Sequence, residues 1–438
     1  MTRGAALAGL VLAVAGLAAV VHRRVLGIVR LPSWPPGADA VTADGAQAAT
    51  EAFATRDGAR PRDAALEFAW STAATLDPWV DGSGFFPRIF ADVDAARSSV
   101  HILMFGWREG QVGTRMAALL EQKLTEGVEV RVLVDGLGSR PYAQAREMFT
   151  RLAAAGAEIV VNDVLPPARV GLFPAARPAW RLDGLGRADH RKLYVVDGSV
   201  AWTGGAGIED HFDDGRFHDL MVRVTGDVVR QAQAAFLTSF RGHGGPLPAD
   251  LSRYFPAPAE PGATPIALAQ VIPGGFVAAS QALREQIDGA RERLDVINPY
   301  LTDPDIVERV LAAAGRAVRV RVVVSRKSNS FAATAALRHR YAELDAAGAE
   351  VWELPDTVVH AKVVVADDVV SFGTVNHDAW ALYRNSELMM LARSSALAAL
   401  VRERLIEPDI ARSARGAPPA GRREQLESRV WDKLTYYI

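Results

Sequence analysis

The chain has 438 residues and a formal net charge of −2, and 49% of its residues are hydrophobic. These are the values of a globular protein, so they exclude a disordered or fibrous chain and give no overall basic field for a nucleic acid. The absence of cysteine excludes disulfides, thiolate metal sites and cysteine nucleophiles.

An uncharged, apolar segment lies at residues 4–21. Its length is about the minimum for a membrane-spanning helix, and more positive charge follows it, at Arg23 and Arg24, than precedes it. Because basic residues favour the cytoplasmic side, we expect residues 1–24 to form a single-pass anchor in the cell membrane, with the rest of the chain in the cytoplasm. A cleaved signal peptide is the main alternative, since residues 13–15 resemble a cleavage site.

Residues 25–62 are rich in Pro, Gly and Ala and show no hydrophobic period, which is typical of a linker. Residues 98–107 then predict a buried strand, residues 114–127 a helix with one apolar face, and residues 128–136 an alternating strand. This strand–helix–strand order predicts a βαβ unit in a largely parallel sheet with helices outside it.

The second part of the chain repeats this order, with a strand at residues 293–301, a helix at 305–315 and a strand at 318–325. Residues 341–354 then echo residues 149–162, because both stretches predict a helix, a glycine and a strand and both contain the run AAGAE. The chain therefore contains an internal duplication.

The duplication divides the chain into two halves, residues 63–253 and 266–438, joined by the proline-rich residues 254–265. The first half is longer because of an insertion, residues 166–187, which carries four arginines among proline and aromatic residues. This insertion is either a solvated loop or a flap that faces an anion or a membrane beside the functional site.

Both halves carry a histidine, a lysine two residues later and an aspartate five residues after that lysine, namely His190, Lys192, Asp197, His360, Lys362 and Asp367. On a strand, side chains two residues apart point to the same face. One such match is often structural, but two matches at equivalent positions of a repeat predict one shared site. Each motif precedes a turn that can bind an anion through backbone N–H groups, at Gly204, Gly205, Gly373 and Thr374.

The paired motifs resemble the HKD motifs of the phospholipase D superfamily. Residues 190–205 (HRKLYVVDGSVAWTGG) and 360–378 (HAKVVVADDVVSFGTVNHD) resemble its bacterial cardiolipin synthase branch, and the likeness covers roughly residues 80–405. It implies an α/β fold of two duplicated α/β/α halves with mixed, largely parallel sheets, packed about a pseudo-twofold axis and preceded by one transmembrane helix. In such a fold both motifs meet in one cleft.

The resemblance also implies a mechanism. One imidazole attacks a phosphodiester phosphorus and forms a phosphohistidine, while the other acts as general acid and base, and histidine suits both roles because its pKa is about 6.5. By analogy with the family His190 is the nucleophile, although from the residues alone either histidine can take either role. Lys192 and Lys362 offset the phosphate charge, and neither a metal nor another cofactor is expected.

Asp219 and Glu387 match the family's histidine-orienting acids, and Asn376 matches an asparagine that contacts phosphate. The first half has Gly207 in place of that asparagine, so we expect the two halves to bind phosphate unequally. The motif aspartates, Asp197 and Asp367, are grouped with the catalytic residues, although their positions at strand ends favour a role in holding a turn.

The function implied is that of a membrane-associated phosphatidyltransferase of phospholipase D type, similar to cardiolipin synthase, that acts on a phosphatidylglycerol-like phospholipid. Hydrolysis of phospholipids by the same chemistry is the main alternative. A nuclease is disfavoured by the near-neutral charge, and a non-catalytic lipid-binding protein by the intact His–Lys pairs. We expect no nucleic acid and no obligate protein partner.

Overall fold

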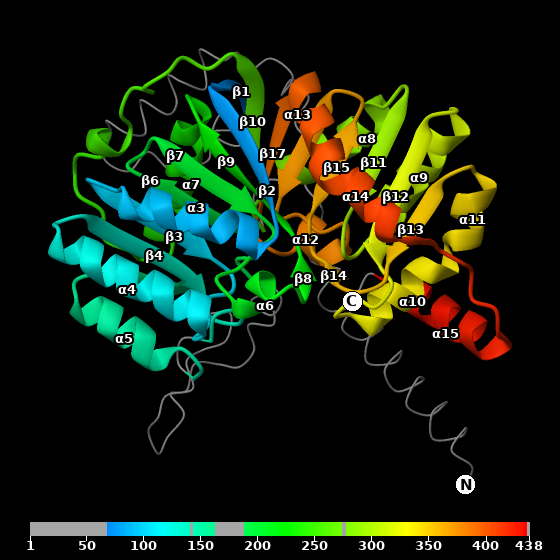
Figure 1. Cartoon of the computed structure of the whole chain (residues 1–438), viewed down its shortest axis with the longest axis horizontal. Coiled ribbons are helices and arrows are strands. Elements are labelled where there is room, and N and C mark those ends of the chain that lie inside the picture. The colour runs from blue at the N-terminus through cyan, green and yellow to red at the C-terminus, as the bar shows by residue number, and fades with distance from the viewer. Residues whose placement is uncertain (1–67, 141–142, 163–187, 274–276, 436–438) are drawn as a thin grey trace, which may run out of the picture.

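The computed structural model of the chain describes residues 68–140, 143–162, 188–273 and 277–435 (Figure 1). The predicted anchor at residues 1–24, the linker at 25–62 and the arginine-rich insertion at 166–187 lie outside these ranges. Within the ranges, we find no helix that is both long enough and apolar enough to cross a membrane.

The first sheet contains seven strands in the order β2-β9-β7-β6-β3-β4-β5. These strands are β2 (Thr75–Val80), β3 (Ser99–Met104), β4 (Glu129–Asp135), β5 (Glu158–Asn162), β6 (Lys192–Val196), β7 (Val200–Gly204) and β9 (Leu220–Thr225). The predicted βαβ unit is present, because α4 (Gln111–Thr125) connects the parallel strands β3 and β4. A second crossover, through α5 (Arg146–Ala154), adds β5 at the sheet edge.

The second sheet contains nine strands in the order β1-β10-β17-β16-β15-β11-β12-β13-β18. They are β1 (Phe68–Ala73), β10 (Thr264–Val271), β11 (Arg293–Ile297), β12 (Arg319–Ser325), β13 (Glu350–Leu354), β15 (Val363–Ala366), β16 (Val369–Gly373), β17 (Glu387–Arg393) and β18 (Ala414–Arg415). Two further strands, β8 (Phe217–His218) and β14 (Val358–Val359), pair with each other and so connect the halves.

Both large sheets are mixed, as predicted, but the prediction that they are largely parallel is wrong. Among the described strands of the two large sheets, only β3–β4–β5 and β11–β12–β13 pair in parallel, and the other neighbours are antiparallel. The motif strands β6 and β15 explain the difference, because each turns back at once into the next strand through a tight hairpin. A hairpin joins only antiparallel strands, whereas a parallel neighbour requires a crossover.

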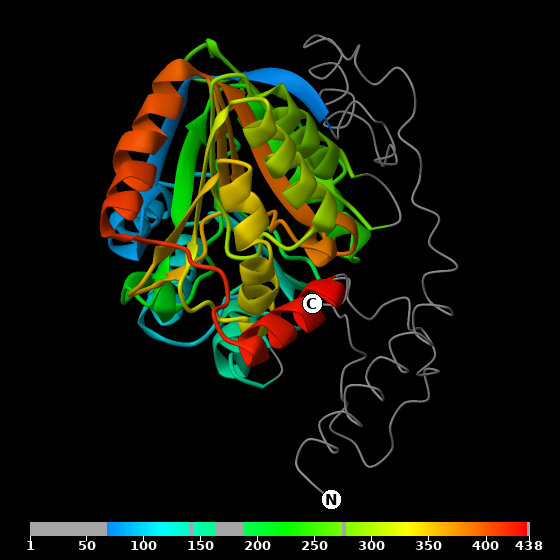
Figure 2. The same cartoon turned by 90° about the vertical axis from the view of Figure 1, so that its right-hand side faces the viewer.

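Helices cover the outer faces of both sheets, and more helices lie between them, so the layers alternate between helix and sheet (Figures 1 and 2). The helices with outer positions are α3 (Gly82–Asp94), α4 and α5 on the first sheet and α8 (Ala278–Gly289), α9 (Pro304–Gly315) and α11 (Tyr341–Ala346) on the second. The other helical segments are α6 (Asp210–Asp213), α7 (Val228–Gly242), η5 (Ser252–Tyr254), α10 (Phe331–His339), α12 (Ala379–Tyr383), α13 (Ser395–Val401), η6 (Arg402–Ile406), α14 (Glu407–Arg412) and α15 (Arg422–Lys433).

The two sheets share one apolar core. Leu193 and Val195 of β6 and Val363 and Val365 of β15 belong to the same buried cluster, together with Phe236 of α7. The alternation of the two motif strands therefore sends one set of side chains from each half into a common interior. This packing holds the ends of the two motif strands close together.

The edges of the two sheets are connected by a single residue. β1 ends at Ala73 and pairs with β10 in the second sheet, whereas β2 begins at Thr75 and pairs with β9 in the first. β1 precedes the predicted junction at residues 254–265 in the chain but belongs to the second sheet, and the last two residues of that junction already begin β10.

Candidate active site

Each motif histidine lies on a short extended segment that pairs with the other half of the chain. The backbone N–H of His190 donates to Ser386 O at 2.9 Å, and the backbone N–H of His360 donates to His218 O at 2.7 Å. Ser386 and His218 directly precede the acids Glu387 and Asp219. The backbone pairing therefore places each histidine beside an acid of the opposite half.

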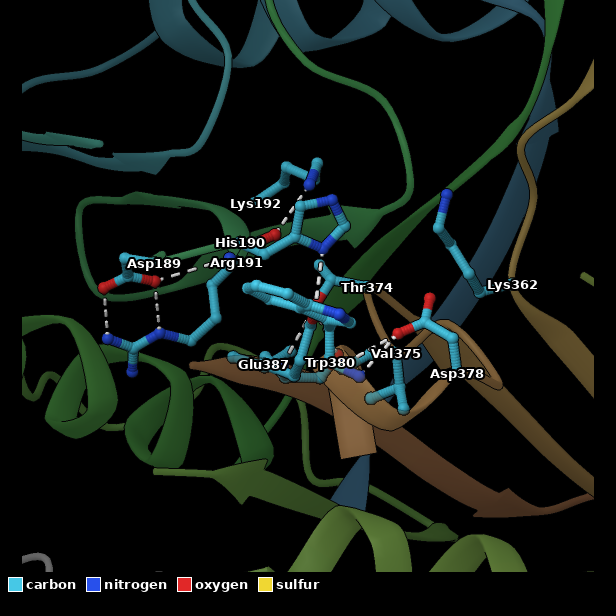
Figure 3. Close-up of polar contacts among 12 residues, drawn as sticks. Asp189, His190, Arg191, Lys192, Lys362, Thr374, Val375, Asp378, Trp380 and Glu387 are labelled. Atoms are coloured by element: carbon cyan, nitrogen blue, oxygen red, sulfur yellow. Dashed lines mark hydrogen bonds and ion pairs between the residues drawn. The ribbon is translucent and has the colours of Figure 1, made fainter. Parts of the chain in front are cut away.

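His190 is held by Glu387 of β17 (Figure 3). Its Nδ1 lies 2.9 and 3.1 Å from the two carboxylate oxygens, and the Glu387 side chain is completely buried. The hydroxyl of Thr374 donates to the same carboxylate, on Oε2. Glu387 is thus fixed from two sides, and it in turn fixes the plane of the His190 ring.

His360 is held by Asp219 in the equivalent way. Its Nδ1 lies 2.7 Å from Asp219 Oδ2, and the backbone N–H of Leu220 donates to Asp219 Oδ1 at 2.7 Å. The residue equivalent to Thr374 is Gly205, where a Cβ atom would lie only 2.5 Å from Asp219 Oδ1. A glycine is required at this position because the shorter acid approaches the backbone closely.

The two motif lysines lie beside the histidines and are almost fully buried. Lys192 Nζ donates to His190 O at 2.6 Å and lies 4.9 Å from the centre of the Phe105 ring. Lys362 Nζ donates to His360 O and lies 2.8 Å from His360 Nδ1. Burial lowers the pKa of Lys192 to about 8 and that of Lys362 to about 7. An anion between them would favour the charged form of both.

Burial, followed by the charges of the two lysines, lowers the pKa of His190 and of His360 well below the usual value. Burial also raises the pKa of the acids, to about 8 for Glu387 and about 6 for Asp219. A neutral imidazole that donates its Nδ1–H to a carboxylate keeps an unprotonated Nε2. Such a ring can attack an electrophile or accept a proton.

The backbone N–H groups of Gly205 and Thr374 do not bind an anion as predicted. They donate instead to Leu220 O and Leu388 O, because the strand pairing continues one residue beyond β7 and β16. Gly204 and Gly373 allow the close approach of these strands, since a Cβ atom at either position would lie within 2.3 Å of a neighbouring carbonyl oxygen. These residues therefore position the acids.

Asn376 and Gly207 occupy equivalent positions with different surroundings. Asn376 is 7% exposed, and its Oδ1 has no hydrogen-bond partner among the described residues. A Cβ atom at Gly207 would lie 2.6 Å from Gly106 O, so an asparagine does not fit there without a shift of the backbone. The two half-sites therefore differ in the space available at these positions, and unequal phosphate binding stays a prediction.

Asp197 and Asp367 lie at the far ends of the motif strands, and their grouping with the catalytic residues is wrong. Asp197 accepts hydrogen bonds from the backbone N–H groups of residues 97–99, and Asp367 from those of residues 291–293. Each aspartate lies seven positions after its histidine along an extended segment, which corresponds to about 23 Å. Both aspartates hold the loops that lead into β3 and β11, as their strand-end positions indicated.

A buried ion pair beside His190 was not identified from the sequence. Arg191 donates to both carboxylate oxygens of Asp189, at 2.8 and 2.6 Å, and to Gln270 Oε1 at 2.6 Å. Asp135, at the end of β4, accepts from Asp189 N at 2.8 Å. The sequence did offer a signal for this ion pair, since the charged residues Asp189 and Arg191 flank the motif histidine. Charged side chains next to an apolar strand require partners.

His218 forms a second charged cluster next to the site. Its Nδ1 lies 2.8 Å from Asp81 Oδ1 and its Nε2 lies 3.0 Å from Asp409 Oδ2. Burial lowers its pKa, but these two acids outweigh that effect and raise it to about 10, so His218 is an imidazolium. Because His218 precedes Asp219, its positive charge favours the ionised form of that acid.

The comparison with protein families agrees with this geometry. The family model described as "Cardiolipin synthase, PLD-like domain" matches residues 89–237 and 283–407, which include both histidines, both lysines and both acids. The chain belongs to this family. In sequence it is similar to the probable cardiolipin synthase YwiE of Bacillus subtilis strain 168, with 28% identity over 329 residues. That match covers 73% of this chain and 62% of the relative.

A cardiolipin synthase of Listeria monocytogenes serotype 4b is 27% identical over 315 residues, which cover 69% of this chain and 62% of that protein. The chain thus spans about three fifths of the length of these curated relatives. In structure it is similar to a phosphatidylserine synthase of Haemophilus influenzae Rd KW20, with a TM-score of 0.62 and 13% identity over 84% of this chain and 97% of that one. A polyphosphate kinase of Porphyromonas gingivalis gives a TM-score of 0.51 at 13% identity, over 78% and 48%. These two structures support the fold alone.

Proposed function

We propose that this chain is a phosphatidyltransferase of phospholipase D type that transfers a phosphatidyl group from a phosphatidylglycerol-like lipid to an alcohol. The observation that carries the proposal is the convergence of two histidine–acid pairs, each made across the halves, with two buried lysines. The names of the curated relatives support cardiolipin synthesis as the reaction.

In the first step, Nε2 of His190 attacks the phosphorus while the bond from phosphorus to the head-group alcohol breaks. The negative charge of the bound phosphodiester offsets the burial that lowers the pKa of His360, so a protonated His360 gives its proton to the leaving alkoxide, which departs as an alcohol such as glycerol. The products are a phosphohistidine at residue 190 and a neutral His360. Lys192 and Lys362 offset the charge of the phosphoryl oxygens.

In the second step, His360 accepts a proton from the hydroxyl of a second lipid. The resulting oxygen attacks the phosphorus, the bond between nitrogen and phosphorus breaks, and His190 is regenerated. Water in place of the second lipid gives phosphatidic acid, which is the hydrolase alternative. The same residues serve both outcomes, so the acceptor decides between them.

The surroundings of the acids support this assignment of the two histidines. The imidazolium of His218 stabilises an ionised Asp219, and an ionised partner favours a protonated His360 that acts as acid. Glu387 instead accepts the uncharged hydroxyl of Thr374, and burial raises its pKa to about 8, so it favours a protonated His190 less than Asp219 favours a protonated His360. We place the enzyme at the cell membrane, with its catalytic halves on the cytoplasmic side.

The test is to incubate the purified chain with phosphatidylglycerol vesicles and to identify the lipid products by mass spectrometry. Cardiolipin and glycerol are expected. Phosphatidic acid without cardiolipin would replace the transferase by a hydrolase. His190→Ala and His360→Ala are expected to abolish turnover without unfolding the chain, whereas the control His339→Ala, on α10, remains active.

The covalent step is tested separately. A reaction stopped with an alkaline denaturant, in which phosphohistidine survives, is digested and its peptides are weighed by mass spectrometry. The phosphatidyl adduct is expected on the peptide that contains residue 190. An adduct on the peptide that contains residue 360 would reverse the roles of the two histidines.

A further inference from the structure

Three large hydrophobic side chains are exposed within the described ranges: Leu137, Phe331 and Leu426, at 51%, 64% and 65%. Leu137 lies in the loop after β4, Phe331 begins α10, and Leu426 lies in the middle of α15. They come from distant parts of the sequence. Their positions in the fold, however, are related to the active site.

Leu137 lies in the loop after β4, and Phe331 lies at the end of the loop between β12 and α10. These two loops follow the strands that support the two histidine segments. Asp135, the last residue of β4, accepts from the backbone N–H of the residue before His190 and also from Leu137 N, at 2.9 Å. Ser325, the last residue of β12, accepts through Oγ from the backbone N–H of the residue before His360, at 2.7 Å. The two loops therefore flank the active site, one from each half.

Helix α15 lies at the same edge of the molecule, where it packs beside α10 (Figures 1 and 2). Residues at its carboxyl end, among them Lys433, line a cavity of about 270 Å³ together with Leu301 and Thr302. The backbone N–H of Thr302 donates to His377 O at 2.9 Å, and His377 follows Asn376 of the site. The helix is therefore separated from the active site by one loop.

Basic side chains accompany all three hydrophobic residues. On α15, the exposed residues Arg422, Leu426, Arg429 and Lys433 are spaced by four, three and four positions, so they form one stripe along the helix. The helix acids Glu424, Glu427 and Asp432 point in other directions around its axis. The loops add the exposed residues Arg140, Arg326 and Lys327. In the part of the chain that the structure describes, none of these six cations makes an ion pair.

Resting on the proposed function, we propose that these three hydrophobic and six basic residues form a docking edge that binds the surface of an anionic phospholipid bilayer. The chemistry of the edge favours this partner. Single exposed apolar side chains enter the boundary between head groups and acyl chains, and dispersed cations attract anionic head groups. A protein partner would instead require a contiguous apolar area, and a nucleic acid would leave the apolar residues without contacts. Docking at this edge presents the active site to the head groups.

The absence of cysteine allows a direct test. Leu137→Cys, Phe331→Cys and Leu426→Cys are each labelled with a polarity-sensitive dye in the full-length chain, which is then reconstituted into vesicles of phosphatidylcholine and phosphatidylglycerol. The matched control is Asp368→Cys, an exposed position in the turn after Asp367 at the far end of the motif strand. We expect the three labels at the edge to shift to the blue and to be quenched by a nitroxide lipid, and the control label to remain in water. The proposal would be overturned if the dyes at the three edge positions stayed in water like the control dye. It would also be overturned if these dyes were already shielded from water before lipid is added.

The electrostatic part is tested with the triple variant Arg422→Gln, Arg429→Gln, Lys433→Gln. Each cation near an anionic surface contributes about a fivefold gain in binding, so vesicle turnover is expected to fall by up to about a hundredfold. Turnover of phosphatidylglycerol in detergent micelles should not change, because none of these residues contacts the site. Equal turnover of the variant and the unchanged chain on vesicles would contradict the proposal. If the unchanged chain turned over no lipid, the proposed function would fail, while the dye labels would still decide the docking edge.

Discussion

Glu387 and Asp219 make the same contact with a histidine in two different environments. Glu387 receives the Thr374 hydroxyl, whereas Asp219 faces Gly205 and receives the backbone N–H of Leu220. The two imidazoles are therefore oriented alike but are electrostatically unequal. This difference suits a reaction in which one ring attacks and the other moves a proton.

The Thr374 hydroxyl should matter for the rate of reaction. Thr374→Val removes a hydrogen bond to a buried carboxylate, and such bonds contribute about 1.5–3 kcal/mol, so kcat is expected to fall by about tenfold or more. Thr302→Val is the matched control, because the Thr302 hydroxyl is buried but has no partner among the described residues. A kcat for Thr374→Val equal to that of the control would show that the hydroxyl does not position Glu387.

His218 should make the stability of the protein depend on alkaline pH. Its folded pKa, about 10, lies above the unfolded value of about 6.5, so its stabilising effect is complete below about pH 6.5 and is lost as the pH rises toward 10. The midpoint of thermal unfolding should therefore fall over this range, and it should fall less in His218→Gln. His218→Arg, which keeps the charge, is the control and should retain more activity than His218→Gln. Parallel pH curves for the wild type and His218→Gln would contradict this role.

The motif residues could be predicted from the sequence because their spacing recurs at equivalent places of a repeat. The partner of each histidine could not, because the pairing of His190 with Glu387 and of His360 with Asp219 depends on how the halves pack. In the same way, the two partners of His218 come from segments far away in the chain. Spacing along one half carries no information about contacts with the other.

At the scale of elements, the strands and helices were predicted correctly where the hydrophobic period is clear, as for β4 and α9. The relative directions of neighbouring strands were not predicted correctly, because hydrophobic periodicity identifies a strand but not the strand that pairs with it. The hairpins of the two motif strands make most neighbours antiparallel. Each hairpin begins at a motif aspartate with a positive φ, 50° at Asp197 and 53° at Asp367, a conformation that Asp tolerates better than most residues.

Asp197 should affect stability rather than chemistry. Asp197→Asn replaces a carboxylate that accepts several backbone hydrogen bonds by a neutral amide, so the free energy of unfolding is expected to fall by about 1–3 kcal/mol. Urea titration measures this loss, and the exposed Asp213→Asn is the control. The kcat of the folded fraction should not change. A large loss of kcat at unchanged stability would return Asp197 to the catalytic group.

At the scale of the whole molecule, the two halves form one folding unit. They share an apolar core between the sheets, and a single residue connects β1 in one sheet with β2 in the other. Each motif histidine takes its acid from the opposite half. The site therefore exists only while both halves are folded and docked together.

This arrangement predicts that activity and structure are lost together. In a urea titration, turnover in detergent micelles and circular dichroism should have the same midpoint, as in a two-state transition. Intrinsic tryptophan fluorescence should follow the same curve, because buried Trp202 and partly buried Trp352 lie in different sheets. A separate transition for either half, or loss of activity well before unfolding, would contradict a single cooperative unit.

Because each histidine is held by the acid of the opposite half, the two copies of the ancestral repeat cannot evolve independently. A substitution of the acid in one copy changes the surroundings of the imidazole in the other copy, so selection acts on the pair. A single unduplicated repeat could build the same site by associating with an identical chain through a twofold axis. Fusion of the copies then permits divergence at positions such as Gly205 and Thr374, where an identical pair of chains would have to carry the same residue twice.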